Sequence, residues 1–207
     1  MALIPVILLS GPSGAGKSTL AARLGLPVLR LDDFYRDGDD PLLPRDAAGR
    51  ADWDAPGSWL ADEAVEAIVA LATTGEVDAP RYELAQDGRV GTTKVVASGA
   101  PAFVAEGLFA DRIVEACRGA GVLADAVVVA PNSATTFVRR LARDVAESRK
   151  GLGLLLRRGL RLWREHGQVV RRCETAGMTR CTPPEAAERL SRWSGANSRG
   201  QDEPLAA

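Results

Sequence analysis

Residues 11–18, Gly-Pro-Ser-Gly-Ala-Gly-Lys-Ser, match the pattern G-x-x-x-x-G-K-[ST] at every fixed position. These residue types suit phosphate binding: glycines let backbone N–H groups face phosphate oxygens, the lysine reaches terminal phosphates, and the hydroxyl ligates Mg2+. Residues 4–9 predict a buried strand before the loop, and residues 18–24 predict a helix whose N-terminus adds partial positive charge. The alternative is a glycine turn that merely joins strand and helix, but this context favours a phosphate loop. The predicted nucleotide contacts are Gly11, Ser13, Gly14, Ala15, Gly16, Lys17, Ser18 and Thr19.

Carboxylates follow two further predicted strands. Residues 26–31 predict a strand that ends at Asp32 and Asp33, and residues 102–105 predict another that ends at Glu106. Because ligands of open α/β sheets bind beyond the carboxyl ends of the strands, we expect catalytic side chains here. Glu106 is a candidate for holding Mg2+ or a water molecule. The alternatives are structural: a turn cap for Asp32 or Asp33, and a buried strand-end carboxylate for Glu106.

Composition predicts one sizeable α/β core. The chain has 207 residues, of which 46% are apolar and 26% are charged, and its net charge is −1. This balance argues against nucleic-acid and anionic-membrane partners. No apolar run is long enough to cross a bilayer, and no cleavage signal precedes the first strand, so we expect a cytoplasmic protein. The cysteines, Cys117, Cys173 and Cys181, lack metal-ligand spacing and predict reduced thiols.

The remaining elements follow from local patterns. We expect a helix over 58–71 capped by Ser58, strands over 77–83, 89–96 and 124–130, and helices over 111–118, 152–172 and 184–193. Asp87-Gly88 predicts a hairpin turn between the first two of these strands. No apolar run after residue 151 predicts a fifth core strand. The polar segment 194–207 is typical of a disordered tail.

An ordered set of motifs resembles the uridine kinase family, from about residue 4 to residue 150. Besides the phosphate loop, the set comprises Leu-Asp-Asp-Phe-Tyr at 31–35, Trp-Asp-Ala-Pro at 53–56, Pro-Arg-Tyr-Glu-Leu at 80–84, Glu-Gly at 106–107 and Arg-Arg-Leu-Ala-Arg-Asp at 139–144. The resemblance extends to phosphoribulokinase and pantothenate kinase. It implies a three-layer α/β sandwich of the P-loop NTPase type with a parallel core sheet. A single domain over 1–193 would carry a β-hairpin insertion at 77–96, a lid at 139–151 and a helical C-terminus.

The resemblance also implies roles for individual residues. Asp32 would be the base near a sugar 5'-hydroxyl, a role that fits the need of phosphoryl transfer for a carboxylate at the nucleophile. Charge on the transferred group would be stabilised by Lys17, Arg140 and Arg143, and Mg2+ would be held by Ser18 and Glu106. The predicted acceptor contacts are Tyr35, Asp54, Tyr82, Asp87 and Arg89. Asp87 stands where the family has a histidine that reads the pyrimidine ring, which opens the choice of acceptor. Packing or surface pairing is the alternative role for the tyrosines and the arginines.

Three hypotheses follow. The first is an ATP- and Mg2+-dependent kinase that phosphorylates the 5'-hydroxyl of a nucleoside, with uridine or cytidine as the expected acceptor. The second keeps phosphoryl transfer but changes the acceptor to another hydroxylated metabolite, such as pantothenate, a sugar phosphate or nicotinamide riboside. The third is a regulatory protein that binds ATP without phosphorylating anything. A small molecule is the expected partner, and the resemblance also allows a homo-oligomer.

Overall fold

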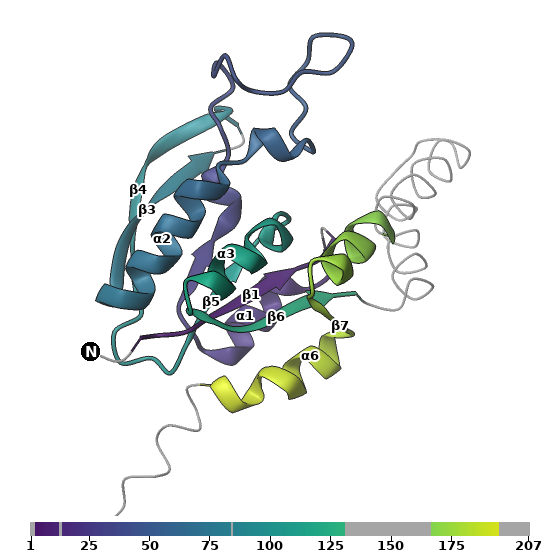
Figure 1. Ribbon diagram of the computed structural model, residues 1–207. Coiled ribbons are helices and arrows are strands. Elements are labelled where there is room, and N and C mark those ends of the chain that lie inside the picture. Colours follow the sequence, from purple (N-terminus) through teal and green to yellow (C-terminus); the bar gives the residue numbers. More distant parts are fainter. Residues whose placement is uncertain (1–2, 13, 84, 131–166, 195–207) are drawn as a thin grey trace, which may run out of the picture.

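The computed structural model describes residues 3–12, 14–83, 85–130 and 167–194. Its centre is a sheet of parallel strands in the order β2-β5-β1-β6-β7 (Figure 1). The strands are β1 (Val6–Ser10), β2 (Val28–Arg30), β5 (Phe103–Glu106), β6 (Leu123–Val129) and β7 (Thr179–Cys181). Leu9 of β1 lies opposite Glu106 on one side and Val127 on the other, so the carboxyl ends of three strands meet at one edge.

Helices cover both faces of this sheet. Since side chains alternate along a strand, Val6 and Leu8 of β1 face one core cluster while Ile7 and Leu9 face another. The first cluster packs under α2 (Ala61–Thr74), α3 (Val114–Gly119) and the helix at 167–175, and the second under α1 (Lys17–Leu24) and α6 (Pro183–Leu190). The continuous apolar run of β1 reflects this burial on both sides. The predicted α/β sandwich of the P-loop NTPase type is confirmed.

A β-hairpin forms a second, antiparallel sheet beside α2 (Figure 1). It consists of β3 (Glu76–Glu83) and β4 (Gly88–Val96), joined by the predicted turn, where Asp87 has a φ of 46°. Two contacts tie its tip to the loop 36–57: the Gly38 N–H donates to the Asp87 carbonyl (2.6 Å), and the Arg89 N–H donates to the Asp37 carboxylate (2.7 Å). The hairpin and this loop are therefore held together.

The expectation that no core strand follows residue 151 was wrong. Thr179–Cys181 form β7 at the edge of the sheet, paired with Val127–Val129 of β6. The strand has three residues, and only Cys181 is buried, so it leaves no apolar run in the sequence. The chain passes from β7 into α6 with only Thr182 between them. A capping box between Thr182 and Glu185 sets the start of that helix.

Two helix starts also differ from the prediction. Ser58 does not cap α2, which begins at Ala61; it lies in a short 3-10 helix (Pro56–Ser58) and donates to the carbonyls of Trp53 and Ala55. The side chain of Ser58 is used within its own turn, so it is not available as a cap. The helix predicted over 111–118 starts as a 3-10 helix (Ala110–Ile113) and continues as α3.

The three cysteines are buried free thiols. In the part of the chain that the structure describes, no helix combines the length and apolar character needed to cross a bilayer.

Asp125 of β6 fixes α6 to the sheet. Its buried carboxylate accepts hydrogen bonds from Arg189 (3.0 Å) and Arg192 (3.0 Å). Because these bonds are charge-assisted but both arginines reach solvent, Asp125→Asn should lower the free energy of unfolding by about 1–2 kcal/mol. Urea denaturation would measure this. Asp46→Asn removes a carboxylate paired with Arg50 on the surface and should leave the urea midpoint almost unchanged. Equal losses in both variants would contradict the assignment.

Candidate active site

The phosphate loop runs from the end of β1 into α1. Gly11 lies against the end of β6, where a Cβ would come 2.4 Å from the Val129 carbonyl oxygen, and its φ is 145°. Lys17 donates to the Gly11 carbonyl oxygen at 2.8 Å. Burial lowers the pKa of Lys17, and the negative charges of Asp32 and Glu106 oppose that shift. The lysine therefore lies among the carboxylates predicted to share its site.

Ser18 and Glu106 form the pair predicted to hold Mg2+. The Ser18 hydroxyl donates to one carboxylate oxygen of Glu106 at 2.8 Å, and the other oxygen, Oε2, is buried without a hydrogen-bond partner. A hydroxyl and a carboxylate are ligands that Mg2+ accepts, and Mg2+ in phosphate sites uses few protein ligands. The donor set thus fits an ion that takes its remaining ligands from phosphates and water.

Asp32 lies just after β2, in a short 3-10 helix (Leu31–Phe34). One oxygen of its carboxylate accepts a hydrogen bond from the Leu108 N–H at 3.2 Å. The backbone of Gly107 packs against the Asp32 side chain: a Cβ added at Gly107 would lie 2.9 Å from the same carboxylate oxygen. The charge of Asp32 contributes to the pKa of Lys17 and to that of Tyr35. The Asp32 carboxylate is therefore near both the phosphate-loop lysine and the aromatic residues described next.

Four aromatic rings cluster beside Asp32. The ring of Tyr35 lies 6.0 Å from each of the rings of Trp53, Tyr82 and Phe109, measured between centroids, and Trp53 lies 6.2 Å from Tyr82. Burial raises the pKa of Tyr35, and the charges of Asp32 and Asp54 raise it further. Burial likewise raises the pKa of Tyr82, to about 12, and its hydroxyl is buried without a partner. The predicted tyrosines are thus brought together.

Neither Trp53 nor Phe109 was predicted as a site residue. Trp53 stands inside one of the motifs used for the family resemblance, which was the available signal. Nothing in the local sequence marks Phe109, because its neighbours in the cluster come from distant segments of the chain.

The other predicted residues take different positions. Asp54 is exposed near Tyr35, and Asp87 occupies the hairpin turn. The guanidinium of Arg89 pairs with Glu63 of α2 at 2.8 Å rather than with an acidic residue of the site. Asp33, expected in a cap, instead accepts a hydrogen bond from the Tyr82 N–H at 3.2 Å. Ser13 and the lid residues Arg140 and Arg143 lie outside the described residues.

A phosphate loop after the central strand of a parallel sheet, with carboxylates at the ends of neighbouring strands, defines an α/β protein of the P-loop class. The chain belongs to the Phosphoribulokinase / Uridine kinase family, whose model matches residues 6–152. The resemblance inferred from the motifs is therefore confirmed.

Three individual proteins are also similar to this chain. The chain is 29% identical over 160 residues to a uridine kinase of Saccharomyces cerevisiae (strain ATCC 204508 / S288c), and the match covers 71% of this chain and 30% of the yeast protein. A solved structure of a possible uridine kinase from Bacillus stearothermophilus matches with 18% identity and a TM-score of 0.47, over 67% of this chain and 77% of that one. A candidate fructose transport system kinase from Silicibacter sp. TM1040 matches with 20% identity and a TM-score of 0.49, over 96% and 84%.

Proposed function

We propose that this protein is an ATP-dependent kinase that transfers the γ-phosphoryl group to the 5'-hydroxyl of a nucleoside, with uridine or cytidine as the first acceptors to test. Family membership supports a small-molecule kinase, and the yeast relative named a uridine kinase supports the nucleoside. The acceptor oxygen would bond to the γ-phosphorus as the bond from that phosphorus to the bridging oxygen of ADP breaks. The proton of the hydroxyl would pass to Asp32.

The position of Asp32 is the observation that carries this proposal. Its carboxylate accepts a hydrogen bond from the Leu108 N–H and is near enough to Lys17 of the phosphate loop and to Tyr35 of the aromatic cluster for its charge to act on both. Phosphoryl transfer to a hydroxyl needs a carboxylate at this kind of junction, because the nucleophile must be oriented and must lose its proton. A protein that only binds ATP would have no use for it.

The other residues of the proposed site would bind the phosphates, the metal ion and the acceptor. Lys17 would interact with the terminal phosphates, and the backbone N–H groups of the loop would bind their oxygens. Ser18 and Glu106 would hold Mg2+, which neutralises charge that develops on the transferred group. The aromatic rings would bind the acceptor and exclude water from it. In this proposal Arg140 and Arg143 complete the site from the lid.

Glu106→Gln should raise the Mg2+ concentration needed for half-maximal activity by about tenfold or more, because it removes the carboxylate charge from the metal-binding pair. A Mg2+ titration at constant ATP would measure the change. Glu66→Gln, on the exposed face of α2, is the matched control and should leave the titration unchanged. If Glu106→Gln needed no more Mg2+ than the wild type, Glu106 would not be a ligand of the metal ion.

A panel of acceptors tests the proposed activity. The protein with Mg-ATP should convert uridine or cytidine to the 5'-monophosphate, detected by acceptor-dependent ADP formation and by the mass of the product. ATP binding without ADP formation on a broad panel would instead favour the regulatory hypothesis.

A second candidate function is phosphorylation of a different hydroxylated metabolite. The observation in its favour is Asp87, which replaces the ring-reading histidine and uses its backbone carbonyl to bind Gly38 at the hairpin tip. A carboxylate cannot donate the hydrogen bonds of a protonated ring nitrogen, so a pyrimidine would be recognised differently. Activity only on pantothenate, a sugar phosphate or nicotinamide riboside in the same panel would select this candidate.

A further inference from the structure

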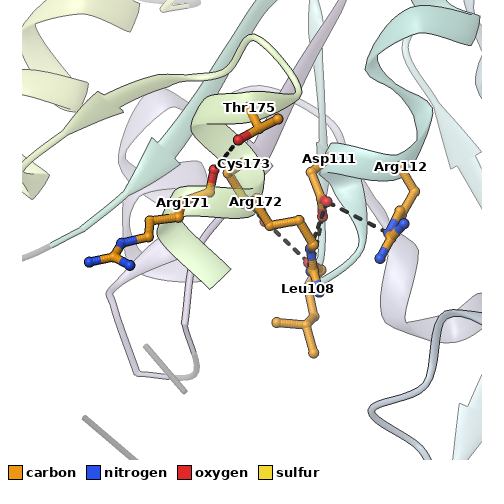
Figure 2. Close-up of polar contacts among 8 residues, drawn as sticks. Leu108, Asp111, Arg112, Arg171, Arg172, Cys173 and Thr175 are labelled. Carbon is orange, nitrogen blue, oxygen red and sulfur yellow. Dashed lines mark hydrogen bonds and ion pairs between the residues drawn. The ribbon is translucent and has the colours of Figure 1, made fainter. Parts of the chain in front are cut away.

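Arg172, in the helix at 167–175, makes a concentrated set of contacts with the segment that follows β5 (Figure 2). Its guanidinium donates two hydrogen bonds to Asp111, at 2.7 and 3.0 Å, and a third to the Leu108 carbonyl oxygen at 3.1 Å. The side chain of Asp111 is only 2% exposed, and its carboxylate lies much closer to Arg172 (2.7 Å) than to its other ion-pair partner, Arg112 (3.8 Å), so Arg172 is the main compensation for its buried charge. The neighbouring Arg171 is exposed and points away from the contacts (Figure 2).

Leu108 connects this ion pair to the proposed base. Its N–H donates to the Asp32 carboxylate, while its carbonyl oxygen accepts from Arg172 and from the hydroxyl of Ser10 (3.3 Å). The thiol of Cys173, next to Arg172 in the helix, donates to that same Ser10 hydroxyl at 3.4 Å. Arg172 therefore contacts Leu108 directly, and Cys173 contacts it through the Ser10 hydroxyl. Leu108 in turn binds the Asp32 carboxylate.

Arg172 also touches the aromatic side of the site. Its guanidinium carbon lies 5.4 Å from the centroid of the Phe109 ring, and Phe109 lies against Tyr35. A guanidinium can stack on a ring and form paired hydrogen bonds with a carboxylate at the same time, which an ammonium cannot do. The Arg172 side chain thus contacts both Leu108, whose N–H binds the Asp32 carboxylate, and Phe109 of the aromatic cluster.

We propose that Arg172 is a positioning residue that holds the segment 107–111 in the arrangement in which Leu108 orients Asp32. This inference rests on the proposed function in so far as Asp32 is taken to be the base. Arg172 acts through Leu108 and Asp111, without contact with the nucleotide. A residue of the helix at 167–175 would then affect the rate of the chemical step by positioning the proposed base.

Kinetics of Arg172→Gln and Arg172→Lys provide the first test, with Arg171→Gln as the control from the same helix. Arg172→Gln should lower kcat about 10–100-fold, because a small displacement of a reacting group has an effect of this size. The dissociation constant of ATP should stay within about twofold, since the lost interaction serves the chemical step. Arg172→Lys keeps the charge but not the paired hydrogen bonds and should fall between Arg172→Gln and the wild type. Arg171→Gln should match the wild type.

Hydrogen exchange provides a second test that does not depend on turnover. In Arg172→Gln, amide exchange in a peptide covering 106–111 should quicken at least about tenfold, because charge-assisted hydrogen bonds to this segment are lost. Exchange in β1 should stay unchanged, which separates a local effect from partial unfolding. Arg172→Lys serves as the folded variant if Arg172→Gln is unstable.

Three results would overturn the inference. They are wild-type kcat in both Arg172 variants, a fall in kcat with unchanged exchange at 106–111, and a loss of ATP affinity as large as the loss of kcat, which would make Arg172 a nucleotide contact. If the wild type phosphorylates no acceptor, the proposed function fails, and the exchange measurement still decides whether Arg172 holds this segment.

Discussion

Asp32→Asn is expected to lower kcat by about 10²–10⁴-fold, the range that a general base contributes. The amide keeps the shape of the side chain and can still accept the hydrogen bond from Leu108, but it cannot take a proton from the acceptor hydroxyl. ATP affinity should be retained, because the phosphate loop is untouched. Steady-state kinetics with the best acceptor, together with calorimetric titration of ATP, would measure both quantities.

The adjacent Asp33 supplies a matched control for this variant. Its carboxylate is buried and accepts a hydrogen bond from the Tyr82 N–H, a contact that an asparagine oxygen can also make. Asp33→Asn should therefore keep most of the turnover. If turnover were lost in Asp33→Asn but kept in Asp32→Asn, Asp33 rather than Asp32 would be the base.

Gly11→Ala is the second variant from which we expect a large effect. The new Cβ would lie 2.4 Å from the Val129 carbonyl oxygen, a backbone atom that cannot rotate away, and the φ of 145° is unfavourable for alanine. Overpacking and backbone strain together should reduce the free energy of unfolding by about 3 kcal/mol. For a chain of this length that corresponds to a fall in Tm of about 6–12 °C. Nucleotide affinity should fall as well, because the loop would shift from β6.

Gly119→Ala is the control for Gly11→Ala. Gly119 ends α3, and a Cβ added there would meet nothing within 4 Å. Alanine favours helix more than glycine does, so Tm should stay the same or rise slightly. Thermal unfolding with and without Mg-ATP would compare the two variants. A Tm for Gly11→Ala equal to that of the wild type would show that the loop is not held against Val129.

The parts of the fold that were predictable are those with strong local signals. The runs Val6–Leu9 of β1 and Ala126–Val129 of β6 are apolar because both faces of the sheet are covered, and the loop between β1 and α1 needs glycines where φ is positive. The hairpin was predictable because Asp87-Gly88 supplies the turn. The end of a buried strand also pointed to Asp32 and Glu106 as neighbours of the phosphate loop.

The parts that were missed depend on contacts between distant segments. β7 is an edge strand of three residues that pairs with β6 across a long stretch of chain, so its own sequence carries little β signal. The start of α2 depends on a side chain that bonds within its own turn, which propensity does not reveal. Arg172 resembles the other arginines of its segment, and only the fold places it against Asp111 and Phe109.

The strand order also bears on how the chain folds during synthesis. β1 precedes the other described strands in the chain and is the central strand of the sheet, yet its neighbours are β5 and β6, beginning at Phe103 and Leu123. At translation rates of about 5–20 residues per second, roughly 100 residues take on the order of 5–20 s to appear. During that time the apolar run Val6–Leu9 has no strand to pair with. Nascent chains of this protein should therefore leave this apolar run unpaired until β5 has left the ribosome.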